Sequence, residues 1–216
     1  MTLVQKYALL PDEIDRQSLM MVEASLPDSL ELTPDERFVV CRIVRAEGDP
    51  QIAESIRISP GAVGRGLAAL RNGAPVLTDV RMVEVGISKS LLAGRGIATH
   101  CRIDTPEVAQ RAQREGTTRS VAAIRELAPL LDGAVVAIGN APTALLALLD
   151  LLGESAAQPA VVLGMPVGFV ACAESKEELE RSGVPFITIR GRRGGSSAAA
   201  AAVNAMLILA GKQAGT

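Results

Sequence analysis

Five short runs rich in β-branched and other apolar residues, separated by stretches with helical patterns, constrain this 216-residue chain more than any other feature. The runs are Pro75–Thr78, Gly96–Ile103, Ala134–Ile138, Ala160–Leu163 and Pro185–Ile189. Three of them are continuously apolar, which is typical of strands covered on both faces. Strands that alternate with helices indicate a parallel sheet between helical layers. We therefore predict an α/β fold, a three-layer α/β/α arrangement with a mainly parallel five-stranded sheet.

Helical patterns follow the second and each later run, and they occupy the first third of the chain. After the first strand we expect helices at Thr105–Glu115, Thr117–Leu131, Pro142–Leu152, Ser175–Arg181 and Ser196–Ala210. Before it, helices are expected at Asp12–Ala24, from Thr33-Pro34 to about Gly48, and from Ser59-Pro60 to Asn72-Gly73, where a cap residue precedes proline. The chain is thus expected to form one domain, residues 1–216, with a helical N-terminal part (1–73) and a parallel α/β part (74–211).

Charge and aromatic content argue against a nucleic-acid partner. The 22 basic and 24 acidic residues give a net charge of −2, which provides no general attraction to phosphate backbones. One tyrosine and three phenylalanines leave few platforms for base stacking. The single histidine, His100, excludes any multi-histidine metal site, and its place inside the second predicted strand favours a structural role.

The cysteines and the apolar stretches indicate a soluble cytoplasmic protein. Cys41, Cys101 and Cys172 are far apart and form no C-x-x-C pair, so neither a zinc site nor a disulfide framework is expected. The N-terminus lacks the basic start and apolar core of a signal peptide. The longest apolar stretch, residues 198–211, is 14 residues and is too short to span a bilayer. No membrane partner is expected.

Ligands of parallel sheets bind outside the carboxyl ends of the strands. This rule selects Asp79 and the loops at residues 139–142, 164–168 and 190–196. The last loop carries three arginines and three glycines before a predicted helix, a combination that suits an anion. It is neither a Walker A loop nor a G-x-G-x-x-G fingerprint. An enzyme that acts on a phosphorylated metabolite at this loop is therefore one open alternative.

The other two loops have less specific interpretations. In residues 139–143, Asn140 is expected as a helix cap with Pro142 in the first turn, and a ligand contact is an equal alternative. The loop at residues 164–170 is apolar and contains two glycines and a proline, so we expect it to line a pocket or an interface. The residues alone thus lead to a parallel α/β protein with a cleft that favours anions.

Six motifs occur in order along the chain: Gly-Ala-Pro-Val-Leu-x-Asp (73–79), Thr-Arg-Ser (118–120), Gly-Asn-Ala-Pro-Thr-Ala-Leu (139–145), Gly-Met-Pro-Val-Gly-Phe-Val (164–170), Ala-Glu-Ser-Lys (173–176) and Arg-Gly-Arg-x-Gly-Gly-Ser (190–196). With these motifs the chain resembles the precorrin-8X methylmutase family of cobalamin biosynthesis, from about Ile14 to the last helix. The resemblance implies a homodimeric α/β/α isomerase without a separate cofactor or metal. Its reaction would be a 1,5-sigmatropic methyl migration on a corrin-type macrocycle, giving hydrogenobyrinic acid or its cobalt counterpart. Such a ring, apolar with a carboxylate fringe, calls for a wide apolar pocket rimmed by arginines and backbone donors.

The resemblance also implies roles for individual residues. The position of the family's catalytic histidine is held by Arg45, within Ile43-Val44-Arg45-Ala46-Glu47-Gly48. The substrate-binding positions would be Ser18, Arg42, Asp79, Lys89, Thr118, Arg119, Asn140, Gly164, Pro166, Arg190, Arg192, Gly194, Gly195 and Ser196.

The family histidine is thought to protonate a ring nitrogen, and an arginine, with a pKa above about 12, does not release protons usefully. Three explanations remain open. Arg45 could act electrostatically, as a hydrogen-bond donor or as a bidentate grip on a carboxylate. Another acid, such as Cys41, Glu47 or His100, could supply the proton. The protein could instead bind a tetrapyrrole without catalysis.

Overall fold

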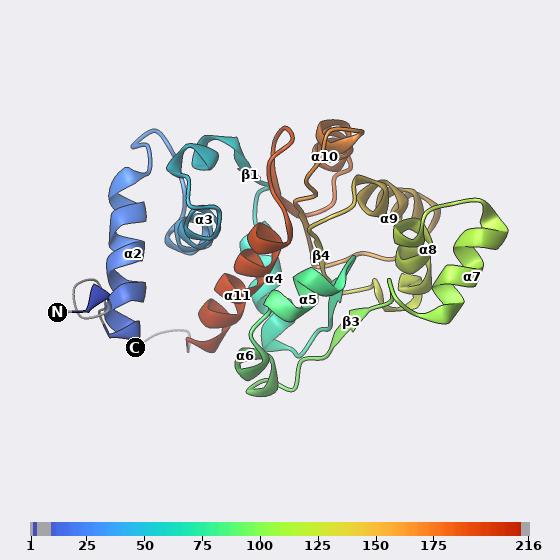
Figure 1. Ribbon diagram of the computed structural model, residues 1–216, viewed down its shortest axis with the longest axis horizontal. Helices are drawn as coiled ribbons and strands as arrows, with labels where there is room; N and C mark the ends of the chain where they lie inside the picture. Colours follow the sequence, from blue (N-terminus) through green and yellow to red (C-terminus); the bar gives the residue numbers. More distant parts are fainter. Residues whose placement is uncertain (1, 4–9, 213–216) are drawn as a thin grey trace.

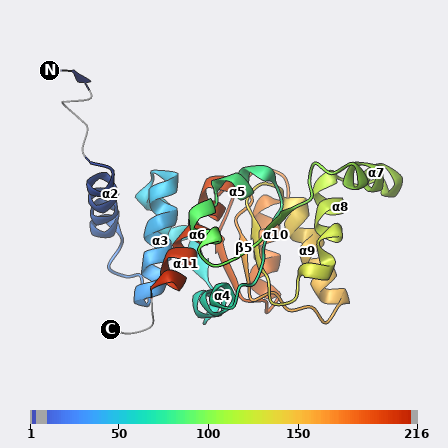
Figure 2. The same cartoon turned by 90° about the horizontal axis from the view of Figure 1, so that it is seen from below.

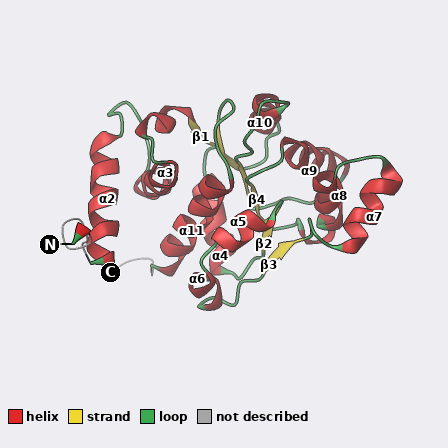
Figure 3. Ribbon diagram, in the orientation of Figure 1, coloured by secondary structure: helices red, strands yellow, loops and turns green. Residues whose placement is uncertain are grey.

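A computed structural model describes all of the chain except residues 1, 4–9 and 213–216. Its centre is a six-stranded sheet with the order β1-β6-β5-β4-β2-β3 (Figure 3). The strands are β1 (Ile56–Ile58), β2 (Val76–Thr78), β3 (Thr99–Cys101), β4 (Val135–Ile138), β5 (Val161–Gly164) and β6 (Phe186–Ile189). The pairs from β6 to β3 are parallel, and β1 alone pairs antiparallel, with Ile56 opposite Ile189. The mainly parallel α/β/α fold is confirmed.

The prediction of five strands is wrong by one. All five predicted runs form strands, but β1 arises in the part of the chain predicted to be helical. It is three residues long and reads Ile-Arg-Ile, a pattern too short to stand out from its helical surroundings. Because β1 lies at the edge of the sheet and pairs only with β6, a partner about 130 residues away along the chain creates it.

Helices cover both faces of the sheet (Figure 1). One layer contains α3 (Pro34–Glu47), α4 (Ala62–Arg71), α5 (Arg81–Gly86), α6 (Lys89–Ala93) and α11 (Ser196–Gly211), and the other contains α8 (Arg119–Glu126), α9 (Pro142–Glu154) and α10 (Cys172–Arg181). Two helices are outermost in Figure 2: α2 (Pro11–Ser25) lies beyond α3, and α7 (Pro106–Glu115) beyond α8. Two 3₁₀ helices, Pro50–Ser55 and Ala128–Leu130, complete the described elements.

Side chains along a strand point alternately toward the two helical layers, because successive side chains of a pleated strand point to opposite faces of the sheet. In β4, Val135 and Ala137 pack into the core with α3, α4 and α11, whereas Val136 and Ile138 pack against α8 and α9. All four side chains are fully buried. The alanine-rich start of α11 is almost entirely buried, which lets this helix pack closely against the sheet.

Most predicted helix ends agree with the structure, but two predicted caps, Ser59 and Asn140, do not cap their helices. Thr33 and Glu36 form a reciprocal capping box, and α3 ends at Gly48 in the left-handed conformation. Ser59 does not cap α4, which begins at Ala62 after Gly61; its hydroxyl accepts a hydrogen bond from the Phe186 N–H instead, at 2.8 Å. The long helix expected over residues 117–131 ends at Glu126 and gives way to a 3₁₀ turn.

The short helices α5 and α6 and the 3₁₀ helix at Pro50–Ser55 were not predicted, because elements of five or six residues carry too little periodicity. Within the described residues, no helix has the length and apolar character that crossing a membrane would require.

Candidate active site

The carboxyl ends of β2, β4, β5 and β6 lie along the same end of the sheet, called the carboxyl edge below. The loops that the sequence predicts to bind a ligand meet there. Asp79, directly after β2, ties two of these strands together. Its carboxylate accepts hydrogen bonds from the backbone N–H groups of Gly139, Asn140 and Ala141, each at 2.9 Å. The side chain is fully buried, and burial raises its pKa while the three N–H donors oppose the shift. Asp79 therefore fixes the turn between β4 and α9 from beneath.

Asn140 is not the helix cap that its sequence context predicts. The residue at the N-cap of α9 is Ala141, and Pro142 occupies the first turn. The N–H of Asn140 is held by Asp79, and its half-buried side chain lies at the carboxyl edge. Asp79 thus does the work expected of the cap, since it satisfies the N–H groups before the helix.

The loop between β6 and α11, residues 190–195, packs on the loop after β5. The N–H of Gly195 donates to the Met165 carbonyl at 2.9 Å, and the Gly168 N–H donates to the Arg192 carbonyl at 3.3 Å. Gly194 has a φ of +136°, and a Cβ there would lie 2.6 Å from the Met165 oxygen. Glycine is required at this position because the two backbones touch.

This loop has the features of an anion subsite. The N–H groups of residues 191–194 make no hydrogen bond within the described part of the chain. The Ser196 Oγ, at the first residue of α11, is buried and has no partner among the described residues. A 16-residue helix directs its positive end at the same place. Unpartnered donors around a helix start suit a carboxylate.

The three arginines of this loop point in different directions. Arg190 pairs with Glu180 of α10 at 2.5 Å, on the outer side of the loop. Arg193 pairs with Asp49, after α3, at 2.7 Å. Arg192 has its guanidinium 5.4 Å from the ring centre of Phe169. Of the two predicted to bind substrate, Arg192 stays close to the β5 loop and Arg190 is engaged elsewhere.

Two arginines of α3 share one carboxylate on α2. Arg42 makes a two-pronged contact with Asp15, with both N–O distances at 3.1 Å, and Arg45 also pairs with Asp15. Arg42 lies over Phe38 as well, 5.3 Å from the ring centre. Ser18, one turn after Asp15, donates its hydroxyl proton to the Ile14 carbonyl at 2.7 Å.

The end of α3 is joined directly to the loop at residues 190–196. Ser197 Oγ donates to Glu47 at 2.9 Å, and Arg193 reaches Asp49. The C-terminal end of α3, two residues after Arg45, therefore lies against the anion subsite. In Figure 1 this loop, in orange-red, lies between α10 and the segment that connects α3 to β1.

The remaining predicted residues divide into two groups. Thr118 caps α8, and its hydroxyl lies 3.4 Å from that of Thr143, so Arg119 begins a helix beside the β4–α9 turn. Arg119 is exposed and has no salt bridge with any described residue. Lys89 instead begins α6, beside Asn204 of α11, and no hydrogen bond or ion pair of the described residues links it to the other predicted site residues.

The alternative proton donors have distinct surroundings. Cys41 donates to Glu23 at 2.9 Å, and burial together with this carboxylate raises the pKa of the thiol to about 12. A thiol of that pKa is poorly matched to proton transfer near neutrality. His100 lies in β3 opposite Leu77, as predicted, and Glu47 is held by Ser197.

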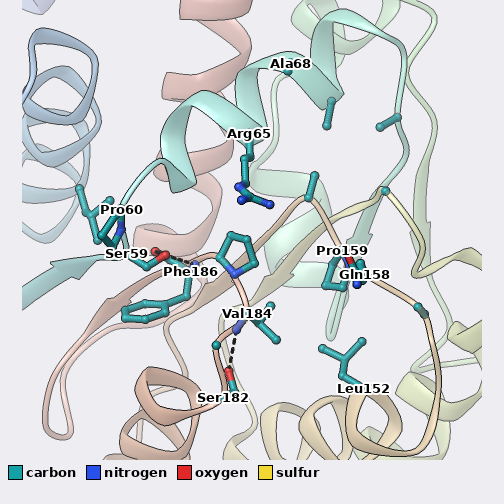
Figure 4. A pocket seen from close by; sticks show the side chains of 18 of the residues that line it. Ser59, Pro60, Arg65, Ala68, Leu152, Gln158, Pro159, Ser182, Val184 and Phe186 are labelled. Carbon is teal, nitrogen blue, oxygen red and sulfur yellow. Dashed lines mark hydrogen bonds between the residues drawn. The ribbon is translucent and has the colours of Figure 1, made fainter.

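A wide cavity lies at the opposite, amino edge of the sheet (Figure 4). It has a volume of about 1200 Å³ and is open to solvent. Arg65 projects into it from α4, facing the turns around Pro159 and Val184. We place the site at the carboxyl edge despite the smaller hollows there, because the unpartnered donors and arginines gather at that edge. Among the described residues, no group of three His, Cys, Asp or Glu side chains could hold a metal ion.

Two residues with notable contacts were assigned no role from the sequence. Asp15 lies three residues before Ser18, on the same face of α2, and this spacing was the available signal. Lys176 belongs to the Ala-Glu-Ser-Lys motif, but its burial could not be read from the sequence, since lysine is almost never fully buried.

Comparisons with known proteins agree along nearly the whole chain. A family model described as CbiC, precorrin-8X methylmutase, matches residues 13–209. The chain is 45% identical to the precorrin-8X methylmutase of Pseudomonas aeruginosa, over 89% of this chain and 93% of that protein. It is 40% identical to the cobalt-precorrin-8 methylmutase of Priestia megaterium, over 93% and 88% respectively. A solved precorrin-8X methylmutase from Thermus thermophilus has a TM-score of 0.85 and 40% identity, covering 92% of this chain and 96% of that structure.

Proposed function

The chain belongs to the precorrin-8X methylmutase family, and we propose that the carboxyl edge of its sheet is where it carries out the family's reaction. The protein is an isomerase of this type: it converts precorrin-8X to hydrogenobyrinic acid by moving a methyl group within the macrocycle. The observation that supports this edge is the set of unpartnered N–H donors beside an apolar loop, with arginines close by. Nothing in the comparisons supports a carrier without catalysis.

The substrate's chemistry matches the proposed surface. Its carboxylate fringe would be bound by the N–H groups of residues 191–194, by Ser196 and by Arg119, and its apolar ring would lie against the loop after β5. In that loop Pro166 is buried and Val167 is 45% exposed. Since the reaction rearranges a single molecule, the protein's task is to hold the ring in one orientation and to stabilise the charge that develops as conjugation shifts.

We propose that Arg45 acts as a fixed hydrogen-bond donor and cation, not as a proton donor. Its guanidinium is held by Asp15 and its side chain is 35% exposed, so it remains available to the ring. Charge developing in the transition state is stabilised by donors that are already oriented. The shared carboxylate of Asp15 provides that orientation for Arg42 and Arg45 together.

The test is incubation of the purified protein with precorrin-8X while the visible spectrum and the mass are followed. An isomerase changes the absorbance and leaves the mass unchanged. The assay is run with and without cobalt in the macrocycle, because relatives at 40% and 45% identity carry both names. Binding without any spectral change would identify a carrier and refute the proposal.

Variants at Arg45 test its role. Arg45→Ala should lower kcat about tenfold, the effect of losing one charge-assisted hydrogen bond. Wild-type activity should not titrate near pH 6.5, whereas Arg45→His should acquire such a titration because it returns a proton donor. Arg65→Ala is the matched control, since this arginine lines the cavity at the amino edge. Wild-type titration near pH 6.5 that disappears in His100→Ala would assign the proton to His100.

We also propose that the protein acts as a homodimer. The adjacent apolar side chains Phe169 and Val170 are 83% and 84% exposed in the loop after β5, and neighbouring exposed apolar side chains are typical of interaction surfaces. A second copy would cover them. Sedimentation at micromolar concentration should give a dimer, and Phe169→Asp should shift it to the monomer. A wild-type monomer under these conditions would contradict the proposal.

Two further expectations belong with this function. We propose that residues 1–216 work as one domain, since α3 and α11 share a core. We also propose a cytoplasmic location, which is supported by three free, buried cysteines.

A further inference from the structure

A fully buried lysine lies beneath the loop at residues 190–196. Lys176, on α10, has 0% exposure, and its Nζ donates to the carbonyl oxygens of Gly191 at 3.0 Å and Arg193 at 2.6 Å. No carboxylate of the described residues lies within salt-bridge distance of Nζ. The negative charge of Glu47 acts on it from farther away and favours the charged form. Burial lowers the pKa of the ammonium group. A buried cation without a paired carboxylate is costly, so it calls for a reason.

The two hydrogen bonds fix the orientation of two peptide groups. In a trans peptide the carbonyl of one residue and the N–H of the next point in opposite directions, and the described chain contains no cis peptide. Because the Gly191 and Arg193 carbonyls face Lys176, the N–H groups of Arg192 and Gly194 face away from α10. Neither N–H has a hydrogen-bond partner among the described residues.

A second side chain of α10 supports the same arrangement. Cys172, one helical turn before Lys176, places its Sγ 3.2 Å from the Pro166 carbonyl oxygen and 3.7 Å from that of Gly191. Gly191 and Gly194 have φ values of +77° and +136°, which permit the carbonyls to turn inward. Contacts from α10 therefore set the conformation of the loop at residues 190–196, and the unpartnered N–H groups of this loop point away from α10.

We propose that Lys176 is a positioning residue for substrate binding: it turns two loop carbonyls inward, so that the N–H groups of Arg192 and Gly194 face the carboxylate fringe of the macrocycle. This inference rests on the proposed function. The buried ammonium group also places a positive charge directly behind these donors. A substrate carboxylate bound across the loop supplies the countercharge that the described chain does not provide at Nζ.

Loss of the Lys176 contacts should affect the binding of substrate and not the rate of the chemical step. The fringe carboxylates are the same in substrate, transition state and product, so donors that bind them stabilise all three equally. Loss of such uniform binding raises KM and leaves kcat unchanged. A lysine that only stabilised the fold would do the reverse, since partial unfolding lowers the active fraction and thus the apparent kcat without changing KM.

The main experiment compares Lys176→Met with wild type. Methionine retains most of the length without the charge. We expect KM for precorrin-8X and Kd for hydrogenobyrinic acid to rise about 10- to 100-fold, with kcat within twofold of wild type. Trypsin should also cleave faster after Arg192 and Arg193, because the loop is no longer held. The control is Arg181→Met, which removes an exposed positive charge from the same helix and should change none of these values.

A second variant keeps the test informative if Lys176→Met folds poorly. Lys176→Ala lacks the atoms of an n-propylammonium ion, and adding this ion should restore product affinity, whereas neutral n-propanol should not. Unchanged KM and Kd in Lys176→Met, or a fall in kcat alone, would overturn the proposal while leaving the methylmutase activity of the wild type intact. Absence of turnover in the wild type would instead refute the proposed function.

Discussion

Replacing Asp79 by Asn should destabilise the protein substantially, because one buried carboxylate accepts three backbone hydrogen bonds. Its Oδ1 accepts from Gly139, and its Oδ2 accepts from Asn140 and Ala141. An asparagine has one acceptor oxygen. With that oxygen in the Oδ2 position, two N–H groups keep a partner and the Gly139 N–H faces an NH₂ group that also donates.

The magnitude follows from these changes. Leaving one buried N–H unpaired costs about 1–3 kcal/mol, and the two remaining bonds each lose roughly 1 kcal/mol when their acceptor becomes neutral. Removal of a charge that burial disfavours offsets part of this loss. The expected net decrease in the free energy of unfolding of Asp79→Asn is about 2–4 kcal/mol. At roughly 2–4 °C per kcal/mol for a chain of this size, Tm should fall by about 5–15 °C.

Urea denaturation followed by circular dichroism measures this difference. Asp104→Asn is the control: its carboxylate lies near the same edge of the sheet but is exposed, and it pairs with Arg81. Surface pairs of this kind contribute about 0–1 kcal/mol. A loss below 1 kcal/mol for Asp79→Asn would refute the reasoning, since the three hydrogen bonds would then contribute little to the fold.

Three further predictions concern the same edge. Arg119→Ala should weaken binding of hydrogenobyrinic acid by about 1.5–3 kcal/mol if a charge-assisted contact is lost, and an unchanged absorbance titration would remove this residue from the site. Gly194→Ala should lower stability by about 2 kcal/mol or more, because its Cβ would meet a carbonyl oxygen at 2.6 Å, whereas Gly153→Ala, with open space around it, should be neutral in the same urea titration. Arg190 lowers the pKa of Glu180, so the pair stabilises the fold at pH values above the pKa of this carboxyl in the unfolded chain. The contribution is lost as the pH falls below about 5. Glu180→Gln should therefore flatten that part of the profile of stability against pH, and an unchanged profile would contradict the prediction.

The sequence predicted the elements whose signals are local. The continuously apolar runs gave β4 and β5, and the Thr33 capping box gave the start of α3. It could not predict β1, since three residues become a strand only when β6 lies beside them. Ser59 and Asn140 were misread as caps for a related reason: each has a tertiary partner, Phe186 and Asp79, that overrides the local preference.

The candidate site was predicted in part. The rule that ligands bind at carboxyl ends of strands selected Asp79 and the loop at residues 190–196 correctly as neighbours of one edge. It did not show that Asp79 is buried beneath the backbone, or that Arg190 turns toward Glu180. Such directions depend on partners far away in the chain. The substrate-binding role that the family resemblance implies for Lys89 stays a prediction, since the structure places this residue on α6 beside α11.

The packing of α3 against α11 has a consequence for the order in which the protein folds as it is synthesised. Val39 and Ile43 of α3 share a core with Ala202 and Met206 of α11, which leaves the ribosome more than 150 residues later. The strand β1 must likewise wait for β6. Because contacts so distant in the chain form slowly, the nascent N-terminal helices have to persist without their apolar cover until the last segment arrives. Arg45 and the anion subsite therefore come together only at the end of folding, and we expect shortened chains that lack α11 to aggregate before they acquire any activity.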